Sequence, residues 1–458
     1  MNGKNMAEES MNRGCMDREK LEQDINSPDY AIRRRAARAI GALIRSGEMK
    51  RTVLKEVNNH VHTTWSFSPY EPSAAAYHAW KAGLGIVGSI DHDSIGAAGE
   101  MLDSAQDIGM ASTVGFEMRV SFLDTPLADR KINNPDSQGI VYMCVHGVPR
   151  QRIGEVSDFL APVNVIRNKR NRAQVEVLQS LVGAYGFDLD FDRDVVPLSH
   201  STQGGSITER HILLAMAIQT VGMKGKGTGT VDFLCTSLGI NVPSRIQGYL
   251  LDDANPHYLY DLIGVYKSSF LPRFFIQPGR DECLDVRQVV DFGRRIGAIP
   301  AYAYLGDVGS SATGDKKAEK FEDDYLDELF DLLVDIGYPA VTYMPPRNTN
   351  AQMMRIQRLA RERGLMEISG VDINSSRQSF NCPELLAPQC HHLVDSAWAL
   401  VAHEKLAGFN EDWGLFSTSS PLADRSLEER IGVYAALGRA MDPFEVESII
   451  KEAEKIFQ

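Results

Sequence analysis

The chain has 458 residues, 43% of them hydrophobic and 24% charged, a balance that excludes disordered, collagen-like and disulfide-scaffold proteins. Its net charge is −13, yet residues 1–55 alone carry +4, so the rest carries −17. Such an acidic body argues against a surface that binds the phosphates of long nucleic acid, while a local basic pocket for one small phosphorylated ligand stays compatible with it.

Membrane insertion and secretion are not expected. No stretch approaches about 18 consecutive apolar residues, and the N-terminus has no apolar signal core. The cysteines lie far apart and form no Cys-x-x-Cys pair, which is typical of reduced thiols in the cytoplasm. These six cysteines are Cys15, Cys144, Cys235, Cys283, Cys382 and Cys390. The sequence therefore predicts a cytoplasmic protein without a membrane partner.

A helical extension is predicted over residues 1–51. Residues 17–47 indicate two helices, with Ser27 as the N-cap of the second and Pro28 at its first helical position. The arginine run at 33–35 is interpreted as a solvated helix face rather than a nucleic-acid contact.

From residue 52 onwards, strand and helix patterns alternate, which is typical of parallel strands covered by helices. Strands are predicted at 52–62, 86–93, 111–120, 138–145, 298–306, 339–344 and 365–374. Seven such strands favour an α/β barrel with its site at the carboxyl ends of the strands.

Two further regions interrupt or follow this alternation. Residues 151–285 are rich in helix patterns and are expected to form a cap inserted into a barrel domain that spans 52–385. Residues 386–458 are predicted to be a C-terminal helical region.

Polar side chains at the strand ends indicate a metal site. His60 and His62 are two residues apart, so both imidazoles lie on one face of a strand and can reach one ion. Neutral imidazole suits zinc, iron or manganese. His92, Asp93 and Glu117 also end predicted strands. The alternative is that these groups only bond to backbone at the strand ends.

Residues 60–100, which begin HVHTTWSFSP and contain SIDHD, resemble the opening of the polymerase-and-histidinol-phosphatase (PHP) family. Glu117 matches the bridging glutamate of that family, and VDIN at 371–374 matches its late Asp-x-His motif. Residues 167–190 and 206–217 are similar to the helical insertion of its nucleotide-phosphoesterase branch. The resemblance covers about residues 53–385. It implies a distorted seven-stranded (β/α) barrel, a cluster of up to three metal ions, and phosphoester hydrolysis.

The sequence departs from the family pattern at several ligand positions. Phe67 occupies the place of an aspartate, Tyr304 that of a histidine, and Asn374 that of the last histidine. The histidine of the fourth strand corresponds by register to Tyr142, with His146 as a displaced candidate.

The resemblance therefore implies one complete metal site and two weakened ones. The complete site would use His60, His62, Glu117 and Asp372. Further ligands for the weakened sites would be His92, His146 and Asn374. We expect one tightly bound divalent ion, which is zinc, manganese or iron.

Roles for other residues follow from the same resemblance. His92 or Asp93 would act as general acid or base, and Tyr304 would donate to a developing oxyanion. The expected substrate-binding residues are Arg170, His211 and Arg377. The predicted function is a metal-dependent phosphoesterase for a small phosphorylated metabolite or nucleotide. The alternatives are a pseudoenzyme that binds a ligand without catalysis, or a metal hydrolase of a non-phosphate bond. The sequence does not determine the oligomeric state.

Overall fold

Seven strands form one curled sheet, a half-barrel, in the order β1 to β7. The computed structural model describes residues 18–309 and 319–457 of the chain. The strands are β1 (Val57–Val61), β2 (Ile86–His92), β3 (Ala111–Ser121), β4 (Ile140–His146), β5 (Ile299–Ala303), β6 (Ala340–Tyr343) and β7 (Met366–Ser369). The seven strands expected from the sequence are therefore confirmed.

The sheet is mixed rather than wholly parallel as predicted. Strand β4 runs antiparallel to both β3 and β5, whereas the other neighbouring pairs are parallel. The reason lies in the connection from β3 to β4, residues 122–139, which contains no helix. A parallel pair needs a crossover, usually helical, to return the chain to the same end of the sheet, and without one the chain reverses.

The chain beyond β7 returns to the end of β1. Ile373 forms a parallel bridge with Val61, in which the Ile373 carbonyl accepts from the His62 amide at 2.9 Å. The Ile373 amide in turn donates to the His60 carbonyl at 3.1 Å. This contact brings Asp372 next to the two histidines of β1.

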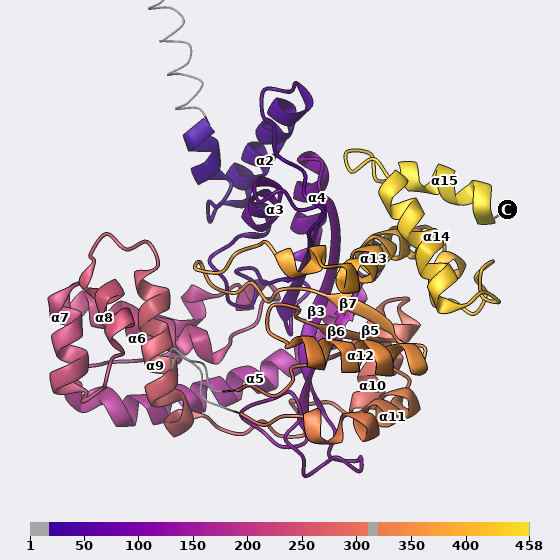
Figure 1. The fold of residues 1–458 in the computed structure, drawn as a ribbon. Coiled ribbons are helices and arrows are strands. Elements are labelled where there is room, and N and C mark those ends of the chain that lie inside the picture. The colour runs from indigo at the N-terminus through magenta and orange to yellow at the C-terminus, as the bar shows by residue number, and fades with distance from the viewer. Residues whose placement is uncertain (1–17, 310–318, 458) are drawn as a thin grey trace, which may run out of the picture.

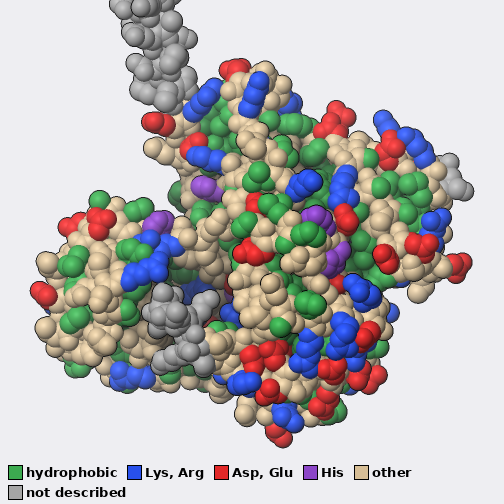
Figure 2. Space-filling model, in the orientation of Figure 1, with side chains coloured by type: hydrophobic (Ala, Val, Ile, Leu, Met, Phe, Trp, Pro, Cys, Tyr) green, Lys and Arg blue, Asp and Glu red, His purple; other side chains and the backbone are tan. Residues whose placement is uncertain are grey.

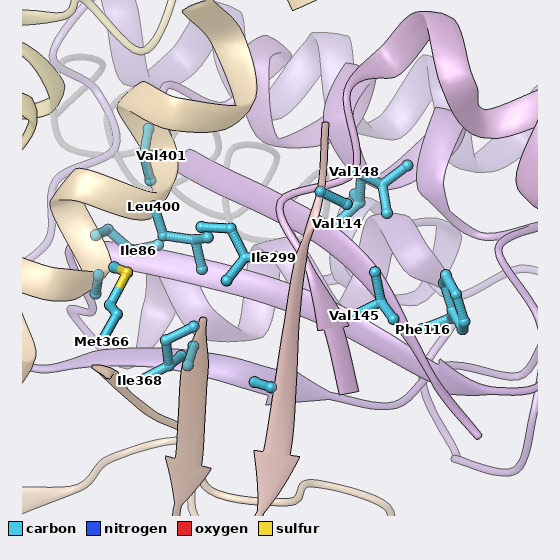
Figure 3. Packing of buried hydrophobic residues seen from close by; sticks show 14 of the residues in the cluster. Ile86, Val114, Phe116, Val145, Val148, Ile299, Met366, Ile368, Leu400 and Val401 are labelled. Carbon is cyan, nitrogen blue, oxygen red and sulfur yellow. The ribbon is translucent and has the colours of Figure 1, made fainter. Parts of the chain in front are cut away.

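Helices pack on the outside of the sheet. They are α3 (Pro72–Lys81), α4 (Ala98–Asp107), α10 (Val286–Arg295), α11 (Leu326–Ile336) and α12 (Asn350–Glu362). The C-terminal helices α13 (His391–Phe409), α14 (Leu427–Ala440) and α15 (Ser448–Phe457) follow. Leu400 and Val401 of α13 lie in the same buried cluster as Ile86 and Ile299 of the sheet (Figure 3). The C-terminal helices thus share the hydrophobic core of the half-barrel.

A separate helical lobe lies between β4 and β5 in the chain (Figure 1). Its helices are α5 (Ile153–Val182), α6 (Glu209–Lys224), α7 (Thr228–Asp232), α8 (Ser244–Leu251) and α9 (Tyr258–Phe274). They surround a second hydrophobic cluster of their own, to which Phe67 contributes from outside the lobe. The Phe67 ring meets the His211 ring edge-on at 5.0 Å. An apolar ring therefore packs against the lobe at the position where the family pattern has an aspartate.

The N-terminal helix α2 (Tyr30–Arg45) is held on the half-barrel by a buried ion pair. Its N-cap is Asp29, whose side chain accepts from the amides of the first turn, and not Ser27 as expected. Arg33 is only 3% exposed and donates to both carboxylate oxygens of Glu100 on α4, at 2.8 and 2.7 Å. The expected solvated face is thus wrong for Arg33, because α2 packs against α4. Residues 1–17 of the predicted extension lie outside the described residues.

None of the described helices combines the length and apolar character needed to cross a membrane.

Candidate metal centre

The end of β1 presents His60 and His62 to Glu117 of β3. His60 Nε2 lies 3.2 Å from Glu117 Oε2, and His62 Nε2 lies 3.6 Å from the same oxygen. One donor atom from each of the three residues falls within a group in which all distances are at most 4.8 Å. The alternation of side chains along β1 explains why two residues spaced by one converge on one carboxylate.

Two more predicted residues border this cluster. His92 Nδ1 lies 3.4 Å from Glu117 Oε2, and its ring lies 4.5 Å from the His62 ring. Asp372 Oδ1 lies 3.2 Å from His62 Nε2 but does not belong to the compact group around Glu117. The Asn374 amide donates to Asp372 Oδ1 at 2.6 Å, so it supports that carboxylate instead of facing the cluster.

The donor set fits a divalent cation. His62 Nε2 is buried and makes no hydrogen bond within the described part of the chain, although two carboxylates lie beside it. The other ring nitrogen, Nδ1, lies 3.3 Å from Ser66 Oγ, which donates to Asp91 at 2.7 Å. A buried nitrogen with a free lone pair among carboxylates is the arrangement that a metal ion satisfies.

The electrostatics of the site favour ionised carboxylates and a neutral His92, but not a neutral His60. Burial lowers the pKa of His60, but Cys144 and Glu117 outweigh burial and raise that pKa well above its usual value, so a bound ion would have to displace a proton from this ring. Burial lowers the pKa of His92 to about 3. Burial opposes ionisation of Glu117, yet the histidines around it lower its pKa to about 2. Burial likewise opposes ionisation of Asp372, but His62 and His60 hold its pKa far below the usual range. At neutral pH the carboxylates are charged and His92 is neutral, as metal binding requires.

The fourth strand places a cysteine, and neither of the two expected residues, opposite Glu117. Cys144 is the register partner of Glu117, and its Sγ lies 4.0 Å from His60 Nδ1. Because β4 is antiparallel, its last residue, His146, lies beside Ile299, the first residue of β5. Both of its ring nitrogens are buried without a hydrogen-bond partner in the described residues. Tyr142, the other expected residue, lies opposite Arg119 of β3, and its ring centroid is 5.9 Å from that of His92.

Two of the three expected catalytic residues are engaged elsewhere. The Asp93 carboxylate forms an ion pair with Arg167 of α5, and Asp93 has a left-handed backbone with φ +48°. The Tyr304 hydroxyl donates to Asp323 Oδ1 at 2.5 Å, so its proton is not available to an oxyanion. The roles of Asp93 and Tyr304 stay predictions, and His92 is the candidate that faces the cluster.

Two of the expected substrate-binding residues, Arg377 and His211, form contacts within the chain, and their roles in binding stay predictions. Arg377 forms an ion pair with Asp261 of α9, with nitrogen–oxygen distances of 2.6 and 2.7 Å. His211 Nδ1 accepts from the backbone amide of Thr208 at 3.0 Å and thereby completes the capping box of α6. The Arg377 contact holds the segment after β7 against the lobe, and the His211 contact starts α6.

The third expected substrate-binding residue, Arg170, belongs to a buried charge network. Glu282 accepts from Arg119 of β3 at 2.8 Å, from Arg167 at 3.1 Å and from Arg170 at 2.6 Å. Arg170 also donates to Glu209 of α6 at 3.0 Å. These ion pairs connect α5 of the lobe to the half-barrel, and they occupy the guanidinium of Arg170.

Two adjoining cavities lie beside the histidine cluster. The larger one, about 370 Å³, contains His60, Glu117 and Asp372 in its wall, together with the ends of β5 and β6. The smaller one, about 110 Å³, is lined by residues of α6 and α9. His92 and Tyr142 border both. Figure 2 shows the surface hollowed between the helical lobe and the body that carries the sheet.

Three cations that sequence analysis missed line these cavities. Arg347 borders the larger cavity, donates to the Leu305 carbonyl at 3.2 Å and forms no ion pair in the described residues. The other two are Arg210 and Lys267. Arg210 of α6 borders the smaller cavity, and Lys267 of α9 borders both. Neither forms an ion pair within residues 18–309 and 319–457, and the Arg210 guanidinium lies 5.9 Å from the Phe67 ring. Arg210 precedes His211 in the sequence, and only the capping geometry of α6 shows which of the two lines the cavity.

No protein-family model and no curated protein matches the sequence. Two solved structures are similar in fold. One is a protein of Bifidobacterium adolescentis assigned as a metal-dependent phosphoesterase, with 17% identity over 72% of this chain and 94% of that chain and a TM-score of 0.47. The other is an amidohydrolase of Chromobacterium violaceum, solved with sulfate and no metal, with 15% identity over 75% of this chain and 96% of that chain and a TM-score of 0.49. Both similarities are too weak to decide the chemistry of this site.

Proposed function

We propose that the chain is a metal-dependent hydrolase of the PHP type that cleaves a phosphoester in a small phosphorylated metabolite or nucleotide. One observation carries the proposal. The cluster of His60, His62 and Glu117 faces a cavity system that is also lined by three cations that form no ion pair in the described residues, namely Arg210, Lys267 and Arg347. A metal site next to unpaired cations suits a phosphate group.

The ion would be held by His60, His62 and Glu117, with Asp372 as the fourth group. A divalent ion bound there would lower the pKa of a water from about 15.7 towards about 7 and would polarise a phosphoryl oxygen. His92 borders the same cavities and is the residue that we assign to proton transfer, although burial lowers its pKa to about 3 and so makes its neutral ring a weak base. Arg210 and Lys267 would neutralise and orient the phosphate.

The geometry of the site bears on the two alternative functions, a hydrolase of a non-phosphate bond and a pseudoenzyme, in different ways. A hydrolase of a non-phosphate bond has no need for the unpaired cations, so they favour the phosphoester. A pseudoenzyme that binds a phosphorylated ligand remains the second candidate, because Asp93 and Tyr304 are engaged in other contacts and leave His92 alone as a proton carrier.

The experiment combines metal analysis with kinetics on a panel of phosphate monoesters and nucleotides. We expect one tightly bound ion per chain, and loss of that ion and of activity in His62→Ala. Arg210→Ala should lower kcat/KM by about 10- to 100-fold, because it removes a charged contact to phosphate. Arg172→Ala is the matched control, since Arg172 is an exposed arginine of the same lobe, paired with Asp192.

The outcomes separate the candidates. Equal activity of Arg210→Ala and Arg172→Ala would contradict the phosphate contact. One tight ion without turnover of any phosphoester would favour the ligand-binding pseudoenzyme. Turnover of an amide or another non-phosphate bond would favour a metal hydrolase that does not act on phosphoesters.

A further inference from the structure

The two histidines of β1 engage their second ring nitrogens in different ways. His62 Nδ1 contacts Ser66 Oγ at 3.3 Å, and His60 Nδ1 contacts Cys144 Sγ at 4.0 Å. In both residues it is the other nitrogen, Nε2, that faces Glu117. Metal-binding histidines generally depend on such a contact to keep the ring oriented.

The position of Cys144 is set by the sheet and not by the histidine. The ladder between β3 and β4 places Cys144 opposite Glu117, and the ladder between β4 and β5 places it opposite Ala301. Its side chain is fully buried. The sulfur therefore has little freedom to move, and the register of the sheet holds it beside the His60 ring.

A buried histidine of this half-barrel does not necessarily have a hydrogen-bond partner for its ring nitrogens. His146 lies two residues further along β4 and is 1% exposed, yet neither of its ring nitrogens has a hydrogen-bond partner in the described part of the chain. The contact of His60 with Cys144 is therefore a specific feature of the cluster.

We propose that Cys144 is a positioning residue whose sulfur accepts the Nδ1 proton of His60 and so directs the Nε2 lone pair towards Glu117 and a bound divalent ion. An imidazole nitrogen binds a metal only when it carries no proton, so Nε2 can do so in a neutral ring only when the proton is on Nδ1. The inference rests on the metal site of the proposed function, but it does not depend on which bond is cleaved.

The test compares three variants of the full chain. Cys144→Ala removes the acceptor, whereas Cys144→Ser keeps a smaller one. Cys390→Ala is the matched control, because Cys390 is equally buried but lies at the start of α13, away from the cluster. The readouts are zinc affinity by competition with a chelator, and the tautomer of His60 by ¹⁵N NMR of histidine-labelled, metal-free protein, with the signal assigned through His60→Gln.

We expect Cys144→Ala to weaken zinc binding by about 10- to 100-fold, the usual effect of losing an outer-shell partner. Cys144→Ser should recover part of the loss, and Cys390→Ala should bind zinc like the wild type. The Nδ1-protonated population of His60 should fall in Cys144→Ala alone.

Unchanged zinc affinity in Cys144→Ala, or an equal loss in Cys390→Ala, would overturn the proposal. So would Cys144→Ser binding no better than Cys144→Ala. If Cys144→Ala does not fold, the tautomer and affinity of Cys144→Ser against Cys390→Ala decide the question. If Cys144→Ala binds zinc more weakly but the wild type hydrolyses no phosphoester, this inference stands while the proposed function fails. A wild type that binds no divalent ion would overturn both.

Discussion

Replacing Glu282 with glutamine should destabilise the junction between the helical lobe and the half-barrel. Glu282 is 1% exposed and accepts hydrogen bonds from Arg119, Arg167 and Arg170. Removing its charge leaves three buried guanidinium groups with only Asp93 and Glu209 as nearby acids. Removing one partner of a buried ion pair costs about 3–5 kcal/mol, and we expect a loss in that range for Glu282→Gln.

Urea denaturation followed by circular dichroism measures this loss. With an m-value of about 3 kcal/mol per molar urea, 3–5 kcal/mol lowers the midpoint by about 1–1.7 M. Amide hydrogen exchange should show the loss of protection in α5, which carries two of the three arginines. Glu328→Gln is the control, because Glu328 is exposed and forms no ion pair in the described residues.

The same substitution should change the acid limb of the stability curve. Burial opposes ionisation of Glu282, but the arginines lower its pKa below the usual value. A lowered pKa contributes stability that is complete above the unfolded-state pKa of about 4.3 and disappears as the pH falls through the lower folded-state value. On acidification from neutral pH to below the folded-state pKa of Glu282, the free energy of unfolding should therefore fall less in Glu282→Gln than in the wild type.

Equal midpoints for Glu282→Gln and Glu328→Gln would refute this account of the junction. A substantial fall in phosphoester turnover with unchanged stability would also refute it, because it would return Arg170 and its neighbours to a role in binding substrate.

Two predictions remain. Tyr304→Phe should leave kcat/KM unchanged and cost about 1 kcal/mol, because the hydroxyl donates to Asp323 and not into the site; a large fall in kcat in a steady-state assay would restore the oxyanion role. Leu400→Ala should lower the unfolding free energy by about 2–5 kcal/mol in thermal and urea denaturation, because the side chain is fully buried against the sheet; an unchanged midpoint would contradict a core shared with the C-terminal helices.

Local patterns in the sequence were sufficient for much of the architecture. Hydrophobic runs and their flanking helix patterns located all seven strands, because a strand buried on both faces and a covering helix each leave a periodic trace. The spacing of His60 and His62 was sufficient to predict that both rings converge at the end of β1, with His60 inside the strand and His62 directly after it. Glu117 was expected at a strand end, but it lies inside β3 and reaches the histidines because the register places it beside His92, the last residue of β2.

Only the tertiary structure decided which partners the remaining polar groups take. The direction of β4 depends on a connection without a helix. This reversal places Cys144 opposite Glu117, and it places His146 opposite Ile299 at the start of β5. Nothing near Arg33, Arg170 or Arg377 in the sequence shows that the residue forms an ion pair. In the structure each of them pairs with a carboxylate that is distant in the chain. An ion pair between distant residues leaves no local pattern, because its energy depends on burial and on the distance between two segments that only the folded chain brings together.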